Sequence, residues 1–395
     1  MTAPPSPAGP PAEITHLVRE RTEARLRHDW SRADALKAQI EAAGWKVADR
    51  GSRTSVVPAA PVSLNVDGQV RYGSAAAVPS LLHAPATTAW TVVIPASEEP
   101  ERLSRLLSAL RSHAPAATQV VVVANDPSDA QVAALAVEAP DRSPIGGAAP
   151  EVLRTSARLG YSAALNIGLR RSAGEFVLLA DATAWPSGDA LSPLAAALQD
   201  PAIAVAGGFG LAAAEPGPLR PNALSRIEAG QRHGAAAAEA ADATALEGAW
   251  LAFRRSDYVD LGPLDEHFVT PAWLDVWWTL RLRAGAEPEG AEYVEPDGEP
   301  GAAPAANGAA RPGAGTPEPQ EPEIDLPAPR RAVRLELPLE REEVAWPPDR
   351  SRLNRRNMYR VLDRFGWRDD LAGASSTNDR QPDNLVRGRG RGDDV

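Results

Sequence analysis

Gln119-Val-Val-Val-Val-Ala124 is the clearest of three apolar runs that decide the fold of this chain. Trp90-Thr-Val-Val-Ile94 precedes it, and Glu175-Phe-Val-Leu-Leu-Ala180 follows it. Runs that are apolar almost throughout, rather than alternating, are typical of strands covered on both faces of a parallel sheet. Helical patterns lie between them, over 98–113, 128–137 and 159–172. This alternation of strands and helices predicts an α/β fold with a mostly parallel sheet flanked by helices.

The composition changes after this region. Residues 286–329 carry ten carboxylates against the single Arg311 and almost no large apolar residue, so we expect a disordered acidic insertion. Arg331-Ala-Val-Arg-Leu335 then alternates and predicts a strand that resumes the fold. An amphipathic helix is expected over 350–366, and its predicted packing face consists of Leu353, Met358, Tyr359, Leu362 and Phe365.

The N-terminal part predicts a separate small unit. Apolar residues from Ile14 to Ile40 recur at helical spacing, with a break at 28–31 where Asp29 can cap a second helix, and Gly44 ends the pattern. We therefore divide the chain into a disordered start (1–12), a helical hairpin (13–56), a connector (57–87), an α/β domain (88–285), the insertion (286–329), a strand and helix that complete the domain (330–370) and a disordered tail (371–395).

Charge and cysteine content exclude several functions. The net charge of −11 lacks the basic field that nucleic-acid binding needs, although the Arg387–Arg391 tail could make weak nonspecific contacts. The absence of cysteine excludes disulfides, thiolate metal sites and cysteine nucleophiles. The start of the chain lacks a signal-peptide pattern and no apolar run reaches 18 residues, so we expect a cytoplasmic protein without a transmembrane segment. The oligomeric state is left open.

Five motifs follow one another between residues 92 and 275. They are Val92-Val-Ile-Pro-Ala-Ser-Glu-Glu99, Val122-Val-Ala-Asn-Asp-Pro-Ser-Asp129, Arg158-Leu-Gly-Tyr-Ser-Ala-Ala-Leu-Asn166, Gly174-Glu-Phe-Val-Leu-Leu-Ala-Asp181, and an acceptor-side segment that includes Leu261-Gly-Pro-Leu-Asp-Glu266 and Asp275. In this order they resemble family 2 glycosyltransferases of the GT-A fold. The resemblance implies inverting transfer of a sugar from a nucleotide-sugar donor to a hydroxyl of a glycan, lipid or small acceptor.

On the donor side, the resemblance implies contacts from residues at the strand ends and in the loops that follow: Pro95, Glu98, Asn125, Asp126, Arg158, Gly160, Asn166 and Asp181. Ala124 stands where the family usually has an aspartate, and Asn125 or Asp126 could substitute for it. Asp181 is the remaining acid of the metal motif, so a divalent metal, Mg²⁺ or Mn²⁺, would be held weakly. The alternative for Asp181 is a turn residue ahead of Pro186.

On the acceptor side, the resemblance implies Asp275 as the general base, with Trp277 in place of a second acid. The alternative is that Asp275 caps the helix that follows it. Four further residues are placed near the acceptor by the resemblance, namely Trp250, Asp265, Glu266 and Trp273. In patterns of this kind such acids more often shape the loop than perform chemistry, and a core or interface role is the commoner one for tryptophan.

The N-terminal hairpin resembles the C-terminal helical module of cysteinyl-tRNA synthetases, through an Arg-rich first helix, Arg32-Ala-Asp-Ala-Leu36 and the Gly before a polar hairpin. A packing or docking role is the simpler interpretation. The substituted acidic positions also leave a second function open for the whole chain, a catalytically degenerate protein that binds nucleotide sugars or glycans. An RNA-associated factor is a third, weaker hypothesis.

Overall fold

The chain divides into two units in the computed structural model. Unit 1 comprises Met1–Leu191, Pro263–Pro271 and Pro338–Glu343, and unit 2 comprises Ser192–Gly262, Ala272–Leu337 and Val344–Val395. The structure describes residues 10, 12–50, 53–58, 61–66, 68–96, 99–127, 132, 135, 145–213, 219–220, 224–227, 240–286, 328–342, 348–349, 351–366 and 368–372. In these residues, no helix is both long and apolar enough to cross a bilayer.

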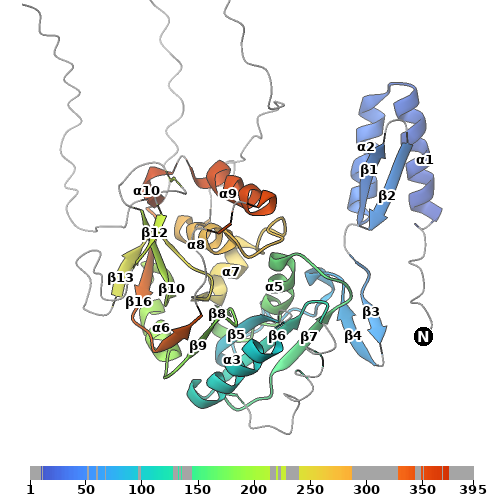
Figure 1. The fold of residues 1–395 in the computed structure, drawn as a ribbon. Coiled ribbons are helices and arrows are strands. Elements are labelled where there is room, and N and C mark those ends of the chain that lie inside the picture. Colours follow the sequence, from blue (N-terminus) through green and yellow to red (C-terminus); the bar gives the residue numbers. More distant parts are fainter. Residues whose placement is uncertain are drawn as a thin grey trace, which may run out of the picture. The chain divides into compact units, whose positions relative to one another are not determined.

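A mostly parallel sheet forms the centre of unit 1 (Figure 1). Its strands lie in the order β8 (Gly174–Ala180), β5 (Thr88–Ala96), β6 (Thr118–Ala124), β7 (Glu151–Thr155), β4 (Gln69–Tyr72) and β3 (Leu64–Val66). Every pairing among β8, β5, β6, β7 and β4 is parallel, and only β3 runs antiparallel to its neighbour. The α/β fold with a mostly parallel sheet is thus confirmed, and the three apolar runs are its central strands.

Helices flank this sheet because each presents an apolar stripe. α3 (Pro100–His113) buries Leu103, Leu106, Leu107 and Leu110, which recur at the spacing of one helix face. α5 (Tyr161–Leu169) is buried along most of its length and packs on β5 and β6. Unit 1 also contains a short 3-10 helix, η1 (Ala75–Ala77), and a two-stranded pair, β9 (Ala184–Pro186) with β17 (Leu339–Arg341). The predicted helix over 128–137 lies mostly outside the described residues.

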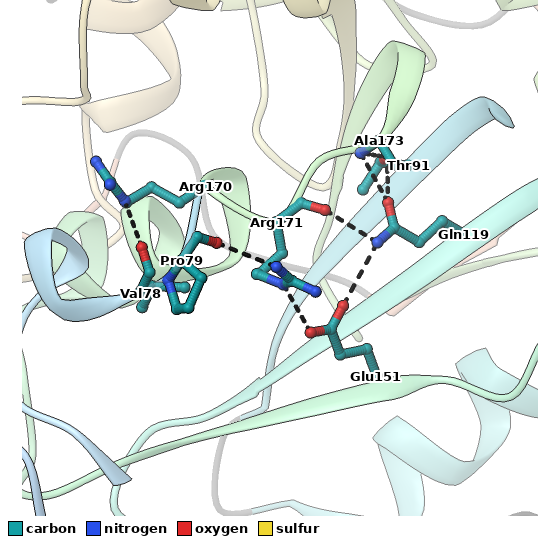
Figure 2. A network of polar contacts seen from close by, with 8 residues as sticks. All are labelled: Val78, Pro79, Thr91, Gln119, Glu151, Arg170, Arg171 and Ala173. Atoms are coloured by element: carbon teal, nitrogen blue, oxygen red, sulfur yellow. Dashed lines mark hydrogen bonds and ion pairs between the residues drawn. The ribbon is translucent and has the colours of Figure 1, made fainter. Parts of the chain in front are cut away.

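Polar side chains join the amino ends of the unit 1 strands (Figure 2). Thr91 donates to Gln119 Oε1 at 2.7 Å, and the backbone N–H groups of Ala173 and Gly174 donate to Thr91 Oγ1. Arg171 Nε donates to Glu151 at 2.8 Å and a second guanidinium nitrogen donates to the Pro79 carbonyl. This network therefore fixes the turn before β8 at the edge of the sheet opposite the strand ends that would bind a ligand.

The N-terminal module contains two helices and a hairpin, as predicted for its helical part. α1 (Ala12–Leu26) packs on α2 (Trp30–Ala42), and β1 (Trp45–Arg50) pairs antiparallel with β2 (Arg53–Pro58). Asp29 caps α2 by accepting from Arg32 N. Arg21 is nearly buried and donates to both carboxylate oxygens of Asp49, at 2.7 and 3.0 Å, which holds the pKa of Asp49 below its usual range. This ion pair ties α1 to β1.

Unit 2 contains a second group of strands. β16 (Arg331–Leu335) pairs parallel with β10 (Ile203–Gly207) and antiparallel with β13 (Ala240–Ala243), while β15 (Trp250–Arg254) pairs antiparallel with β10. A smaller sheet has the order β12 (Leu224–Arg226), β11 (Gly210–Ala213) and β14 (Ala245–Leu246). The strand predicted after the acidic segment is therefore present as β16.

The helices of unit 2 are α7 (Arg255–Leu261), α8 (Leu274–Ala284), α9 (Arg352–Phe365) and α10 (Asp369–Ala372), while α6 (Leu191–Leu198) begins at the unit boundary. The predicted packing face of α9 was partly wrong. Leu353 and Tyr359 are 45% and 56% exposed, whereas Asn357, Val361 and Phe365 are buried. The reason is that Asn357 Nδ2 donates to the Ala272 carbonyl, which turns this side of the helix inward.

Candidate active site

A pocket of about 270 Å³ lies in unit 1 at the carboxyl ends of three parallel strands. Open α/β sheets bind ligands at this edge, because the loops that follow the strands converge there. Its lining comes from the ends of β5, β6 and β8, the loop and first turn of α5, and a segment of the chain after Phe268, namely Pro95, Ala96, Asn125, Asp126, Pro127, Arg158, Leu159, Tyr161, Ala164, Asp181, Val269, Thr270 and Pro271. Five of the eight residues predicted for the donor side thus line one pocket.

The end of β6 is shaped by Asn125. Its side-chain amide donates to the Leu159 carbonyl at 3.0 Å and its Oδ1 accepts from Leu159 N at 2.8 Å. Thr155 bridges Asn125 and the backbone N–H of Asp126, which has a left-handed φ of 53°. Asn125 therefore holds the Arg158 loop against β6 with the same amide that would otherwise bind a ligand. Asp126, held in this unusual conformation, is the better candidate for a donor contact.

Asn166 does not line this pocket. It is 1% exposed, its Nδ2 donates to the Leu264 carbonyl at 2.9 Å, and its Oδ1 accepts from Leu264 N at 3.0 Å. This burial and these backbone contacts favour a structural role for Asn166, and its direct donor contact stays a prediction. Asn166 anchors the loop that carries Val269–Pro271 to the pocket. Ser162 Oγ supports this by donating to the Phe268 carbonyl.

Asp265 and Glu266 shape this same loop. Asp265 Oδ1 accepts from the backbone N–H of His267 and lies 2.7 Å from the His267 ring nitrogen. Glu266 Oε1 accepts from Asn166 Nδ2 at 3.2 Å. Of the two interpretations that the sequence left open, these contacts favour the loop-shaping one.

Asp181 lines the pocket directly after β8, but it is also a turn residue. Its Oδ1 accepts from Thr183 N at 2.8 Å, and both flanking alanines, Ala180 and Ala182, are buried. Across the described residues, no cluster of three or more His, Cys, Asp or Glu side chains could hold a metal. Because Asp181 supplies a single carboxylate that is partly engaged, these residues do not form a metal site by themselves.

The remaining donor-side predictions differ in outcome. Pro95 and Arg158 line the pocket, and Arg158 is exposed enough to meet a charged ligand. Gly160 precedes α5, where an added Cβ would lie 3.2 Å from Val269 Cγ1, so its small size allows a close approach of the two loops. Glu98 lies outside the described residues.

Asp275 lies in the first turn of α8, in unit 2. Its Oδ2 accepts from Gly248 N at 2.8 Å and its Oδ1 accepts from Val276 N at 2.8 Å. Although part of the residue reaches the surface, its carboxylate sits among protein atoms, and this loss of hydration raises the pKa of Asp275 to about 7. The two N–H groups act in the opposite direction, and nearby Glu247 raises the pKa further.

This environment combines both interpretations of Asp275. The side chain accepts from a backbone N–H in the first turn of α8, as a capping residue would, and its proton affinity is in the range where a general base works at neutral pH. Trp273, directly ahead of α8, has a left-handed φ of 69°, an uncommon conformation for an aromatic residue. Such strain clusters at functional positions.

The tryptophans near α8 are core residues. Trp250 is fully buried in β15, and Trp273 is 5% exposed. Trp278 packs edge-on against Phe253 and Tyr258. Because a ring must present a face to stack on a sugar, the burial of Trp250 favours the core role that the sequence left open. Trp273 has almost no exposed surface, which favours the core role for it too.

Comparison with known proteins adds independent information at this point. Residues 91–262 match the model of glycosyl transferase family 2. The matched segment runs from β5 of the unit 1 sheet to the end of α7. This match supports the predicted resemblance of the segment to family 2 glycosyltransferases.

Several solved glycosyltransferases align with parts of the chain. A mannosyltransferase from Pyrobaculum calidifontis, solved with GDP-Man and Mn²⁺, is 20% identical with a TM-score of 0.36, and the alignment covers 51% of this chain and 56% of that one. GalNAc-T7, solved with UDP, GalNAc and Mn²⁺, is 12% identical with a TM-score of 0.47, over 70% and 48% of the two chains. TarS of S. aureus is 17% identical with a TM-score of 0.35, over 49% and 33%.

A curated relative matches a shorter stretch. Cysteine--tRNA ligase of Opitutus terrae is 43% identical over 60 residues, which make up 15% of this chain and 13% of the ligase. The chain therefore spans only a small part of that enzyme. The resemblance of the N-terminal module to a synthetase module has this partial support, and its role stays a prediction.

Several residues in and around the segment that matches family 2 were not singled out from the sequence. Tyr161 was part of a recognised motif, and its position directly after Gly160 could have indicated it. Val269–Pro271 carry no motif; they reach the pocket because Tyr161 N donates to the Val269 carbonyl over more than 100 residues of chain. Glu247 also gave no local signal, since its importance depends on contact with a strand and a helix distant in sequence.

Proposed function

We propose that this protein transfers a sugar from a nucleotide-sugar donor to a hydroxyl acceptor, with inversion at the anomeric carbon. The observation that carries the proposal is the pocket at the carboxyl ends of β5, β6 and β8, because these three strand ends lie in the segment that matches family 2. The carboxylate of Asp275, whose pKa is raised to about 7, supplies a group suited to take a proton from the acceptor.

In this proposal the donor occupies the unit 1 pocket. Asp126 and the backbone of Pro95 and Ala96 contact the nucleoside, and the guanidinium of Arg158 offsets charge on the diphosphate. Asn125 and Asn166 do not touch the donor; they hold the loops that carry Arg158 and Thr270. A rigid pocket of this kind lowers the entropic cost of placing the reacting atoms.

The proposed reaction is a single displacement. The acceptor oxygen forms a bond to the anomeric carbon while the bond from that carbon to the diphosphate oxygen breaks, and its electron pair leaves with the nucleoside diphosphate. The acceptor proton passes to the ionised Asp275. Below the pKa of Asp275 the carboxyl is protonated and cannot accept it, so the rate is expected to rise with pH towards a plateau above about 7.

The proposal is tested by transfer and hydrolysis assays on the full chain with a panel of nucleotide sugars, each with Mn²⁺, with Mg²⁺ and with a chelator. Asp275→Asn should abolish turnover while donor binding, measured by calorimetry, is kept. Asp126→Asn, at the proposed nucleoside contact, should weaken binding of the nucleoside diphosphate. Asp260→Asn, which changes an exposed aspartate outside the pocket, is the matched control and should leave both properties unchanged. Turnover that persists in Asp275→Asn would contradict the assignment.

A second candidate function is binding of a nucleotide sugar without catalysis. It is favoured by Asp181 being flanked by buried alanines and by its engagement with Thr183. Donor binding to the wild-type chain with no turnover of any donor, with or without metal, would support this function. The same experiment thus separates the two candidates.

A further inference from the structure

The segment Leu246–Gly248 lies along α8 and is fastened at three successive residues. Leu246 N donates to Thr279 Oγ1 at 3.2 Å, and Gly248 N donates to Asp275 Oδ2 at 2.8 Å. Thr279 and Asp275 are four residues apart and therefore on one face of the helix. Between these two contacts, Glu247 N donates to the Phe209 carbonyl at 2.9 Å. The contacts of Leu246 and Gly248 therefore fix the backbone on both sides of Glu247.

The Glu247 carboxylate is buried and paired. The residue is 4% exposed, and its two oxygens accept from Arg226 Nε at 2.7 Å and from Arg226 Nη2 at 3.0 Å. Two parallel bonds of this kind fix orientation as well as charge. Arg226 is the last residue of β12, and its partner in the strand pairing is Leu211 of β11. The small sheet of unit 2 therefore holds a buried negative charge one residue from Gly248.

Gly248 makes the contact with Asp275 unusually close. A Cβ added at Gly248 would lie 3.1 Å from Asp275 Cβ and 3.6 Å from Asp275 Oδ2. Any displacement of the segment would therefore move the N–H group that holds the Asp275 carboxylate. A change in the Arg226–Glu247 contact would therefore also move the Gly248 N–H group that donates to the Asp275 carboxylate.

We propose that the Arg226–Glu247 ion pair is a positioning device for Asp275, which fixes the Gly248 N–H on its carboxylate and sets the net charge beside it. The catalytic meaning of this inference rests on the proposed function, in which Asp275 is the general base. Arg226 and Glu247 act through Asp275 and do not themselves touch the reacting atoms.

Other charged groups on elements packed against α8 are engaged elsewhere. Arg283, at the far end of α8, donates to the carbonyls of Thr244 and Leu371. On α7, Asp257 pairs with Arg330, and on β16, Arg331 pairs with Asp242. α9 reaches the turn ahead of α8 through the uncharged Asn357. Glu247 exerts the largest charge effect on the pKa of Asp275 and raises it.

The test is a carboxyl NMR titration of the full chain labelled at aspartate, with the Asp275 signal assigned by its loss in Asp275→Asn. Glu247→Gln should lower the pKa of Asp275 by about one unit, because a negative charge is removed while Arg226 stays. Arg226→Met combined with Glu247→Gln removes both charges and should return the pKa to within about half a unit of the wild-type value. Asp242→Asn, which disrupts an equally buried ion pair on β13, is the control and should cause no shift.

A merely structural role gives a different result. If the ion pair only supported packing, both Glu247→Gln and the double variant would admit water and lower the pKa of Asp275 equally. Such an equal decrease would overturn the inference. The absence of any shift in the pKa would overturn it too. The titration needs no substrate. If the pKa of Asp275 shifts as expected but no donor is turned over, the proposed function is contradicted while the positioning role of the ion pair is supported.

Discussion

At Asp275, two backbone N–H groups favour the charged carboxylate, and burial and Glu247 oppose it. The raised pKa shows that burial dominates. A residue of this kind carries a cost for folding, because the unfolded chain ionises it readily in water. Functional carboxylates often have such environments, in which a proton affinity near neutral pH is obtained at the expense of stability.

The stability of unit 2 should therefore depend on pH through Asp275. The pKa is raised in the folded state, from 3.8 to about 7, so the contribution of Asp275 is fully present below pH 4 and is lost as the pH rises through 7. We expect the loss to be a few kcal/mol, at about 1.4 kcal/mol per pKa unit. Urea unfolding of the wild-type chain and of Asp275→Asn between pH 4 and 8 checks this. Equal pH dependence in the two proteins would contradict it.

Among the elements, α5 connects the sheet to the pocket. It packs on β5 and β6, begins at the loop held by Asn125, and carries Asn166, which anchors the segment leading to Val269–Pro271. Gly168 brings the helix close to the sheet, since an added Cβ would lie 2.5 Å from Val93 Cγ1 and 2.9 Å from Val123 Cγ2. The pocket geometry thus depends on a helix that has no room for a larger residue at this position.

Gly168→Ala should destabilise unit 1 by about 1–3 kcal/mol, the usual cost of overpacking a close contact. Helix propensity alone predicts the opposite sign, because alanine is favoured over glycine in a helix by about 1 kcal/mol. Thermal unfolding of the variant distinguishes the two effects. Gly262→Ala, where the space is open but φ is +80°, serves as a comparison in which backbone strain rather than a clash is introduced. A stabilised Gly168→Ala protein would show that α5 can shift away from the sheet.

At the scale of the whole molecule, the residues that flank the long acidic segment lie side by side. Arg330 N donates to the Arg283 carbonyl at 2.9 Å, and Arg283 Nε donates to the Arg330 carbonyl at 3.2 Å. Arg283 is 1% exposed, and loss of hydration lowers its pKa to about 10. The contacts of this buried guanidinium with main-chain oxygens join α8 to the start of β16. The residues on the two sides of the acidic segment are therefore held together by direct hydrogen bonds.

Replacing residues 287–327 by a short Gly/Ser linker should leave the fold intact. A shorter connection changes the entropy of loop closure by only about 1 kcal/mol, and in the favourable direction. We expect the thermal midpoint to be unchanged or slightly raised, whereas removing residues 331–335 with the segment should lower it strongly because β16 pairs with both β10 and β13. A large drop with the linker alone would show that the segment supports the folded core.

The sheet and its flanking helices could be predicted because their signals are local. Val120–Ala124 is apolar at every position, and Leu103, Leu106, Leu107 and Leu110 follow the helical period, so each segment indicates its own burial. The position of the pocket followed from the same pattern, since parallel strands end at one edge. The resemblance to family 2 glycosyltransferases indicated Asp126, Arg158 and Asp181 as residues of this edge before any contact was known.

Only the tertiary structure decided the roles within the site. Asn166 had the appearance of a donor contact, and Trp250 of a sugar platform, yet both are buried, because long-range contacts with Leu264 and with the core of unit 2 determine what each side chain meets. The importance of Glu247 arises in the same way, from Arg226 on one side and Gly248 and Asp275 on the other. Sequence alone determines which segments must be buried, since hydrophobic periodicity is a local property; which polar atoms remain free for chemistry depends on partners that only folding brings together.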